Sequence, residues 1–111
     1  RTNVWSLNLT ANHLDGTIPS ELATLEQLQS LDLGKNILDG PLPTKLCSLK
    51  RLRELFLEEN NLTGPLPTQI GDMESLHDLF LGNNAMDGAI PYVLDSLKNL
   101  RSLSLNDNFF S

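Results

Sequence analysis

The residues of this chain that could carry metal or acid–base chemistry gather around His77, with Asp78 beside it and Asp72 and Glu74 just before it. Histidine together with carboxylates is a common set for both chemistries. Neighbouring residues of an extended strand point to different places, however, and Asp72 and Glu74 belong to an outer turn, so we expect a solvated surface. No nucleophile elbow, phosphate-binding loop, zinc-binding helix or kinase signature occurs. We therefore predict no catalytic residue, no metal site, no cofactor and no enzyme activity.

Composition narrows the classes of partner. Cys47 is the single cysteine, which excludes an internal disulfide and a metal site built on paired cysteines. We expect Cys47 to be a small, partly buried apolar residue of a helical turn rather than a reactive thiol. The net charge of −6 lacks the basic footprint of nucleic-acid binding and suits a partner with basic patches. From this charge we predict no nucleic-acid partner. No run of 18 apolar residues occurs, so we also predict no membrane contact in this segment.

The secondary structure expected around these residues follows from a repeat of 24 residues. Leucine recurs at a spacing of 24, and asparagine, glycine and proline follow it at fixed offsets. The columns include Leu7, Leu31, Leu55, Leu79 and Leu103; Asn12, Asn36, Asn60, Asn84 and Asn108; Gly16, Gly40, Gly64 and Gly88; and Pro19, Pro43, Pro67 and Pro91. The repeat predicts a single array over 1–111, with four full units (4–27, 28–51, 52–75 and 76–99) and a partial fifth (100–111).

Each column has a physical interpretation. The L-x-L triplet alternates apolar and polar residues, which predicts a short strand with one buried face. A 24-residue unit is too short to bury that face alone, whereas units stacked in parallel bury it together. The column asparagines follow the strand, where we expect their amides to bond turn backbone and form an internal ladder. The glycines predict a tight or positive-φ turn, and each proline precedes a short helical or 3₁₀ turn.

These columns resemble the leucine-rich-repeat family. The stretches "NHLDGTIPSELATLEQL" and "NNLTGPLPTQIGDMESL" look like its plant-type subclass, whose unit reads L-x-x-L-x-L-x-x-N-x-L-x-G-x-I-P-x-x-L-x-x-L. The resemblance covers the whole chain and implies an α/β solenoid, a curved horseshoe. A parallel sheet would line its concave side, with short strands after the glycine and helical or 3₁₀ turns on the convex side. Arrays of this family normally end in caps, which are absent here, so we expect a fragment that adjoins further repeats.

Side chains between the inward leucines should point to the concave surface, where this family usually binds. Neighbouring strands lie ~4.8 Å apart, so we expect Phe56 and Phe80 to touch as a cross-strand pair, with a hollow beside the rings at Gly34 and Gly82. The acidic side chains expected around the pair are Asp32, Glu54, Glu58, Glu59 and Asp78. The basic side chains expected along one edge are Arg53, His77 and Arg101.

Two interpretations of the Phe56–Phe80 pair stay open. As an aromatic anchor with an acidic rim, it would suit a ligand that presents an apolar group next to a Lys or Arg. Alternatively, phenylalanine has a high β-propensity, and the pair simply stabilises its own sheet.

The resemblance implies a module that recognises a peptide or protein as part of a receptor-like ectodomain. The alternatives are a secreted inhibitor and a structural spacer within a longer array. The implied location is extracellular or at the cell surface, with an intracellular one left open. Sequons begin at Asn8 and Asn61. Asn61, expected in an exposed turn, suits glycosylation in a secreted protein, whereas a glycan on Asn8 would block the concave sheet.

Overall fold

The computed structural model describes residues 4–111 as a stack of coils, each made of a strand and a second short strand, and in the first four coils a 3₁₀ turn follows. The strands form two parallel five-stranded sheets. The first sheet has the order β1 (Ser6–Asn8), β3 (Ser30–Asp32), β5 (Glu54–Phe56), β7 (Asp78–Phe80) and β9 (Ser102–Ser104). The second has the order β2 (Asp15–Thr17), β4 (Ile37–Gly40), β6 (Asn61–Gly64), β8 (Ala85–Gly88) and β10 (Phe109–Phe110).

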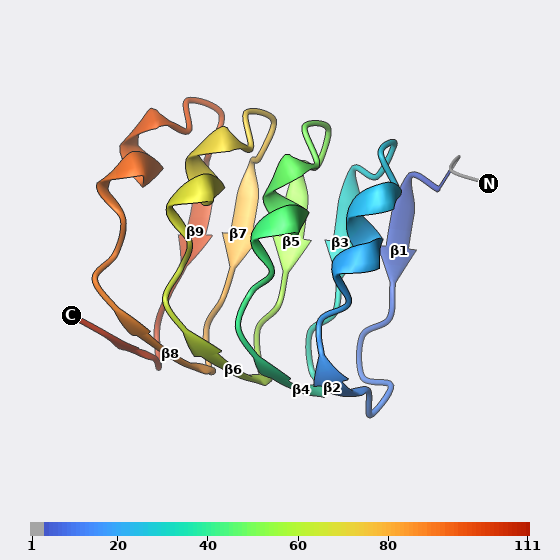
Figure 1. Ribbon diagram of the computed structural model, residues 1–111, viewed down its shortest axis with the longest axis vertical. Coiled ribbons are helices and arrows are strands. Elements are labelled where there is room, and N and C mark those ends of the chain that lie inside the picture. The colour runs from blue at the N-terminus through green and yellow to red at the C-terminus, as the bar shows by residue number, and fades with distance from the viewer. Residues whose placement is uncertain (1–3) are drawn as a thin grey trace.

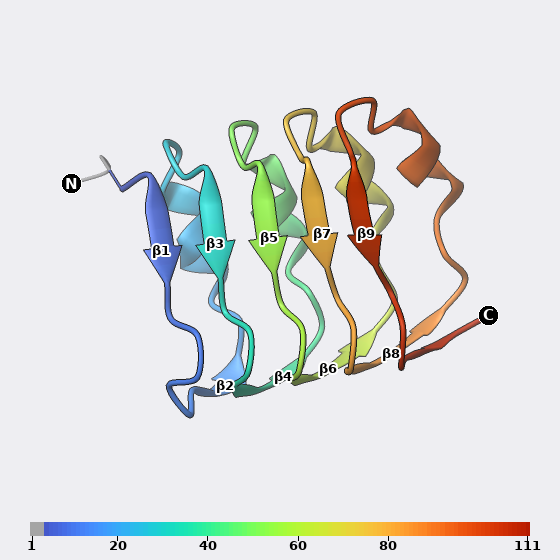
Figure 2. The same cartoon turned by 180° about the vertical axis from the view of Figure 1, so that it is seen from behind.

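The two sheets and the turns enclose one core. Figure 1 shows the 3₁₀ turns in front of the first sheet, and Figure 2 shows the same sheet from its other side. The second sheet runs along one edge of the array, and the two termini lie at opposite ends of the stack. The turns are η1 (Ser20–Thr24), η2 (Thr44–Ser48), η3 (Thr68–Asp72) and η4 (Tyr92–Ser96). This is the parallel-sheet solenoid with short outer turns that the repeat predicts.

Inward leucines hold the first sheet in register. Leu31, Leu55 and Leu79 pair with one another across β3, β5 and β7, and each is at most 1% exposed. A residue and its equivalent 24 positions later are therefore direct neighbours, and the burial of each leucine depends on the coils on both sides. Leu103, in the last strand of the stack, is 44% exposed. No helix in residues 4–111 is long and apolar enough to cross a membrane.

The asparagine column forms the predicted ladder, and the amides bond backbone rather than one another. The Nδ2 of Asn60 donates to the carbonyls of Leu33, Leu57 and Glu58 at 3.0–3.3 Å. Its Oδ1 accepts the backbone N–H of Leu38 at 3.0 Å. Equivalent bonds come from the other three asparagines that have a preceding coil, namely Asn36, Asn84 and Asn108. Each amide thus ties its own turn to the coil before it.

The second strands correct one expectation. They were expected after the glycine, but β4, β6 and β8 end at Gly40, Gly64 and Gly88, and β2 has Gly16 at its centre. These four glycines have φ between 74° and 79°. A left-handed residue breaks the extended conformation, so the glycine ends the strand in three of the four coils.

The residues just before the ladder asparagines, here called the left-handed column, have a positive φ although none of them is glycine. No sequence pattern signalled this conformation. The members of this column have φ between 56° and 59° and are Ala11, Lys35, Glu59, Asn83 and Asp107. In this conformation Lys35 and Glu59 donate their backbone N–H to the carbonyls of Glu58 and Gly82 in the next coil, at 2.9 Å. These inter-coil bonds hold L-residues in a conformation that costs roughly 1–2 kcal/mol.

Candidate ligand-binding face

The side of the first sheet that faces away from the core, here called the open face, carries the predicted aromatic pair. Phe56 and Phe80 are the last residues of β5 and β7 and pair in register. Their ring centroids lie 4.9 Å apart and the ring planes are tilted by 46°. Each ring is half-buried because it packs against the other, so neither stands free in water. The contact between the two rings is confirmed.

The predicted hollow beside the rings is filled. A Cβ on Gly34 would lie 3.1 Å from Glu58 Oε1 and 3.2 Å from Asp32 Oδ1. A Cβ on Gly82 would lie 2.7 Å from Asn106 Oδ1. Both glycines therefore let a side chain of the next coil lie across the backbone, and that side chain occupies the space expected for a ligand. The expectation is wrong because adjacent coils sit close enough for their polar side chains to close it.

Three acidic residues around Phe56 form no ion pair within residues 4–111. Glu54 begins β5 and is half-buried, and Asp32 ends β3 with its Oδ1 accepting the backbone N–H of Gly34 at 3.0 Å. Glu58 Oε1 is buried and has no hydrogen-bond partner within residues 4–111. Over the same residues, the single ion pair joins Arg101 to Asp78. Asp32, Glu54 and Glu58 therefore leave a negative potential beside the aromatic pair.

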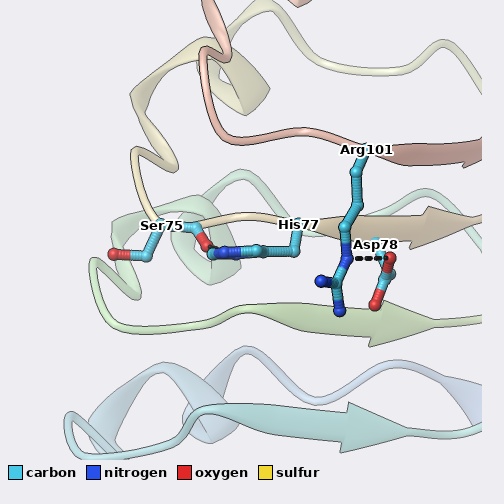
Figure 3. Close-up of polar contacts among 4 residues, drawn as sticks. All are labelled: Ser75, His77, Asp78 and Arg101. Atoms are coloured by element: carbon cyan, nitrogen blue, oxygen red, sulfur yellow. Dashed lines mark hydrogen bonds and ion pairs between the residues drawn. The ribbon is translucent and has the colours of Figure 1, made fainter.

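Asp78 and His77 occupy different surroundings, as predicted for adjacent residues. The Asp78 side chain is only 12% exposed, and its Oδ1 lies 3.4 Å from Arg101 Nε. His77 turns the other way, and its Nδ1 lies 2.6 Å from the carbonyl oxygen of Ser75 (Figure 3). A carbonyl accepts, so Nδ1 carries the proton of this bond. Asp78 thus supports Arg101 instead of forming an open part of the acidic rim.

The basic edge borders a shallow groove at the start of the strands. This groove has a volume of about 330 Å³ and is lined on its basic side by Arg53, His77 and Arg101 and on its polar side by Ser30 and Glu54. Trp5, 57% exposed, lies at its β1 end. The expected basic edge is therefore present, and it lies next to the acidic residue that begins β5.

Other candidate residues lie away from this arrangement. Asp72 and Glu74 are exposed at and just after η3, and no group of three or more His, Cys, Asp or Glu within residues 4–111 is arranged to hold a metal ion. Glu59 is exposed in the left-handed column. Cys47 lies in η2 and is fully buried rather than partly so. Burial raises the pKa of its thiol to about 11, helped by the charge of Asp72 and opposed by that of Lys50.

The two sequon asparagines are both exposed but differ in setting. Asn8 ends β1 on the open face, and its Oδ1 accepts from the backbone N–H and hydroxyl of Thr10, at 3.0 and 2.5 Å. Asn61 begins β6 in the second sheet, away from the open face, and not in the turn expected for it. Its backbone pairs with Asp39 of β4, because the strand starts directly after the ladder residue.

Comparison with known proteins gives both family and fold. The sequence model described as Leucine rich repeat matches residues 2–62 and 50–110. Among curated protein sequences, none matches the chain significantly. Among solved structures, a chain of the BIR3–SERK2 complex from Arabidopsis thaliana is 43% identical, with a TM-score of 0.92 over 95% of this chain and 56% of that chain.

Two further structures are complexes with a similar fold. The PEPR1–AtPEP1 complex is 38% identical, with a TM-score of 0.95 over 98% of this chain and 15% of that chain. The ectodomain of the Arabidopsis receptor kinase HAESA, in complex with an N-terminally extended IDA peptide hormone, is 36% identical. Its TM-score is 0.92 over 96% of this chain and 18% of that chain. The chain thus spans about half of one matched chain and under a fifth of two others. The 24-residue register, the asparagine ladder and the matched family model together identify it as a member of the leucine-rich-repeat family, with structural similarity to plant receptor ectodomains.

Proposed function

We propose that this chain is a recognition module that binds a peptide or a segment of a protein on its open face, and that it acts by binding rather than by catalysis. The observation that carries this proposal is the Phe56–Phe80 pair. The rings form an aromatic platform between adjacent strands, with Glu54 and Glu58 beside Phe56. Aromatic anchors with polar surroundings are typical centres of binding energy. The ligand best suited to this platform has an apolar side chain next to a Lys or Arg.

The similar structures support the class of partner and the location. One of them is a receptor-kinase ectodomain in complex with a peptide hormone, and another is a complex of two proteins. By analogy with these ectodomains, this chain works outside the cell or at its surface as part of a receptor-like protein.

A selection of peptides tests the proposal. Random seven-residue peptides displayed on phage would be selected on the protein and then compared on the Phe56→Ser/Phe80→Ser variant. We expect enriched peptides to share an apolar residue with a Lys or Arg one or two positions away. They should bind the variant at least about 30-fold more weakly, the loss expected from a hot spot of ~2 kcal/mol.

A matched control uses the same column at the two ends of the stack. The Asn8→Ser/Ser104→Ala variant changes the residues equivalent to the phenylalanines in β1 and β9 and should leave affinity within about twofold, since it leaves the platform intact. Circular dichroism would verify that both variants fold. If no peptide is enriched, or if enriched peptides bind the phenylalanine variant equally well, the proposal is wrong and the pair serves only to stabilise the sheet.

A further inference from the structure

Building on the proposed function, we propose that the open face selects the order of charges in its ligand: an apolar side chain on the phenylalanine pair, then a basic side chain at Glu54, then an acidic side chain between Arg53 and Arg101. The inference concerns a peptide segment that carries both charges. If no ligand binds the aromatic platform, this inference fails together with the proposed function.

The order follows from three rows that run across the strands. Within the β5 coil, Phe56, Glu54 and Arg53 contribute one residue to each row. At ~3.3 Å per residue, the Glu54 row lies ~7 Å from the phenylalanines and the Arg53 row ~10 Å from them. Parallel stacking at ~4.8 Å carries the rows from coil to coil. In the β5 coil, the backbone position of Glu54 therefore lies between those of Phe56 and Arg53.

Backbone geometry brings the basic row into the groove. The carbonyl of Arg53 accepts two N–H groups, from His77 at 2.7 Å and Asp78 at 3.0 Å. The carbonyl of His77 likewise accepts from Arg101 at 2.8 Å and Ser102 at 3.1 Å. The regular alternation of side chains between the two faces of the sheet therefore begins only after Arg53, His77 and Arg101. As a result, Arg53 and Arg101 line the same groove as Glu54.

The two arginines remain available to a ligand. Arg101 reaches across β7, and Asp78 holds it there through Nε alone (Figure 3). The terminal nitrogens of Arg101 and the side chain of Arg53 have no hydrogen-bond partner within the described chain. Arginine forks bind carboxylates through paired, charge-assisted hydrogen bonds. His77 forms part of the wall, since its Nδ1 is committed to Ser75.

The neighbouring charges discriminate against the reverse order. A ligand with its acidic residue nearer the apolar one would place that carboxylate against Glu54 and its basic residue against the arginines. Like-charge contacts on both sides would then oppose binding, which is how interfaces reject a wrong register.

The test uses the peptides selected on the aromatic platform. Each would be synthesised with acetylated and amidated ends in two forms, the selected sequence and a version with its basic and acidic residues exchanged. We expect the base to lie between the apolar residue and the acid in the selected peptides, as in Leu-Gly-Lys-Glu or Glu-Lys-Gly-Leu. On the unmodified protein, the exchanged form should bind at least tenfold more weakly by isothermal titration calorimetry.

Variants separate this inference from the proposed function. In Arg53→Gln/Arg101→Gln, replacing the peptide's Glu by Gln should change affinity by less than twofold, whereas on the unmodified protein it should cost at least fivefold. The control Lys45→Gln/Lys98→Gln removes the same number of charges at exposed sites on the turn side and should behave like the unmodified protein. Two outcomes would overturn this inference and leave the proposed function standing. In the first, peptides depend on the phenylalanines but show no preference for charge order. In the second, replacing the peptide's Glu by Gln has the same effect on affinity in both variants.

Discussion

Phe56 and Phe80 meet across β5 and β7 with ring centroids 4.9 Å apart, as a direct result of in-register parallel pairing. Aromatic contacts of this kind contribute roughly 0.5–1.5 kcal/mol beyond the area they bury. We expect Phe56→Ala and Phe80→Ala to show a coupling energy in that range in a double-mutant cycle, measured by urea unfolding. Additive effects within about 0.3 kcal/mol would show that the rings stabilise the sheet independently.

Replacing the ladder residue Asn60 by Ala should strongly destabilise the array. The change removes the amide that bonds three carbonyls and the N–H of Leu38. Each buried backbone group left without a partner costs roughly 1–3 kcal/mol. We expect the free energy of unfolding to fall by at least about 3 kcal/mol, measured by urea denaturation followed by circular dichroism.

Asn12→Ala is the matched control for that change. Asn12 belongs to the same column but is exposed, and within residues 4–111 its side-chain amide makes one bond, to the Thr10 carbonyl at 3.2 Å. Removing the Asn12 amide should lower the free energy of unfolding by less than about 1 kcal/mol. Similar losses at Asn12 and Asn60 would mean that the inter-coil bonds are not what makes the ladder stabilising.

Glu58→Gln should stabilise the fold and weaken binding. Glu58 Oε1 is buried without a partner in residues 4–111, and it approaches the space above Gly34 together with Asp32 Oδ1. An amide removes the like charge and offers a donor to that carboxylate, so we expect a gain of about 1 kcal/mol in thermal or urea unfolding. Affinity for peptides selected through Lys or Arg should fall, because one attractive charge is lost.

Glu59→Gln controls for net charge, since Glu59 is the next residue and is exposed. This substitution should change the free energy of unfolding by no more than about 0.5 kcal/mol. An equal or smaller gain at Glu58 than at Glu59 would indicate that general repulsion in an acidic chain, and not the contact over Gly34, accounts for the effect.

Cys47 should give the protein an alkaline instability. Burial raises the pKa of its thiol from 9.0 to about 11, so between these values the unfolded chain loses its proton while the folded chain keeps it. Stability from this group is therefore complete below pH 9 and falls by roughly 2–3 kcal/mol as pH rises to 11. Cys47→Ala should flatten this part of the stability–pH curve, measured by urea unfolding at intervals from pH 8 to 11. An unchanged slope in Cys47→Ala would assign the alkaline loss to other groups.

The 24-residue repeat specifies which equivalent residues become neighbours in the fold. In a parallel stack, translation by one coil maps each residue onto the one 24 positions later, so a column in the sequence becomes a row in space. This is why the leucine core, the asparagine ladder and the contact between Phe56 and Phe80 could all be predicted. It is also why the sequence predicts the basic edge of Arg53, His77 and Arg101.

Contacts between residues of different columns, in contrast, depend on the packing of the folded chain. The space beside Gly34 and Gly82 is closed by Asp32, Glu58 and Asn106, and Asp78 is withdrawn from the acidic rim by Arg101. These contacts depend on side-chain rotamers and on neighbours at non-equivalent positions, which the repeat does not specify. The left-handed residues before each asparagine were hidden for a related reason. Inter-coil hydrogen bonds impose this conformation on Lys35 and Glu59, and no local preference of these two residue types reveals it.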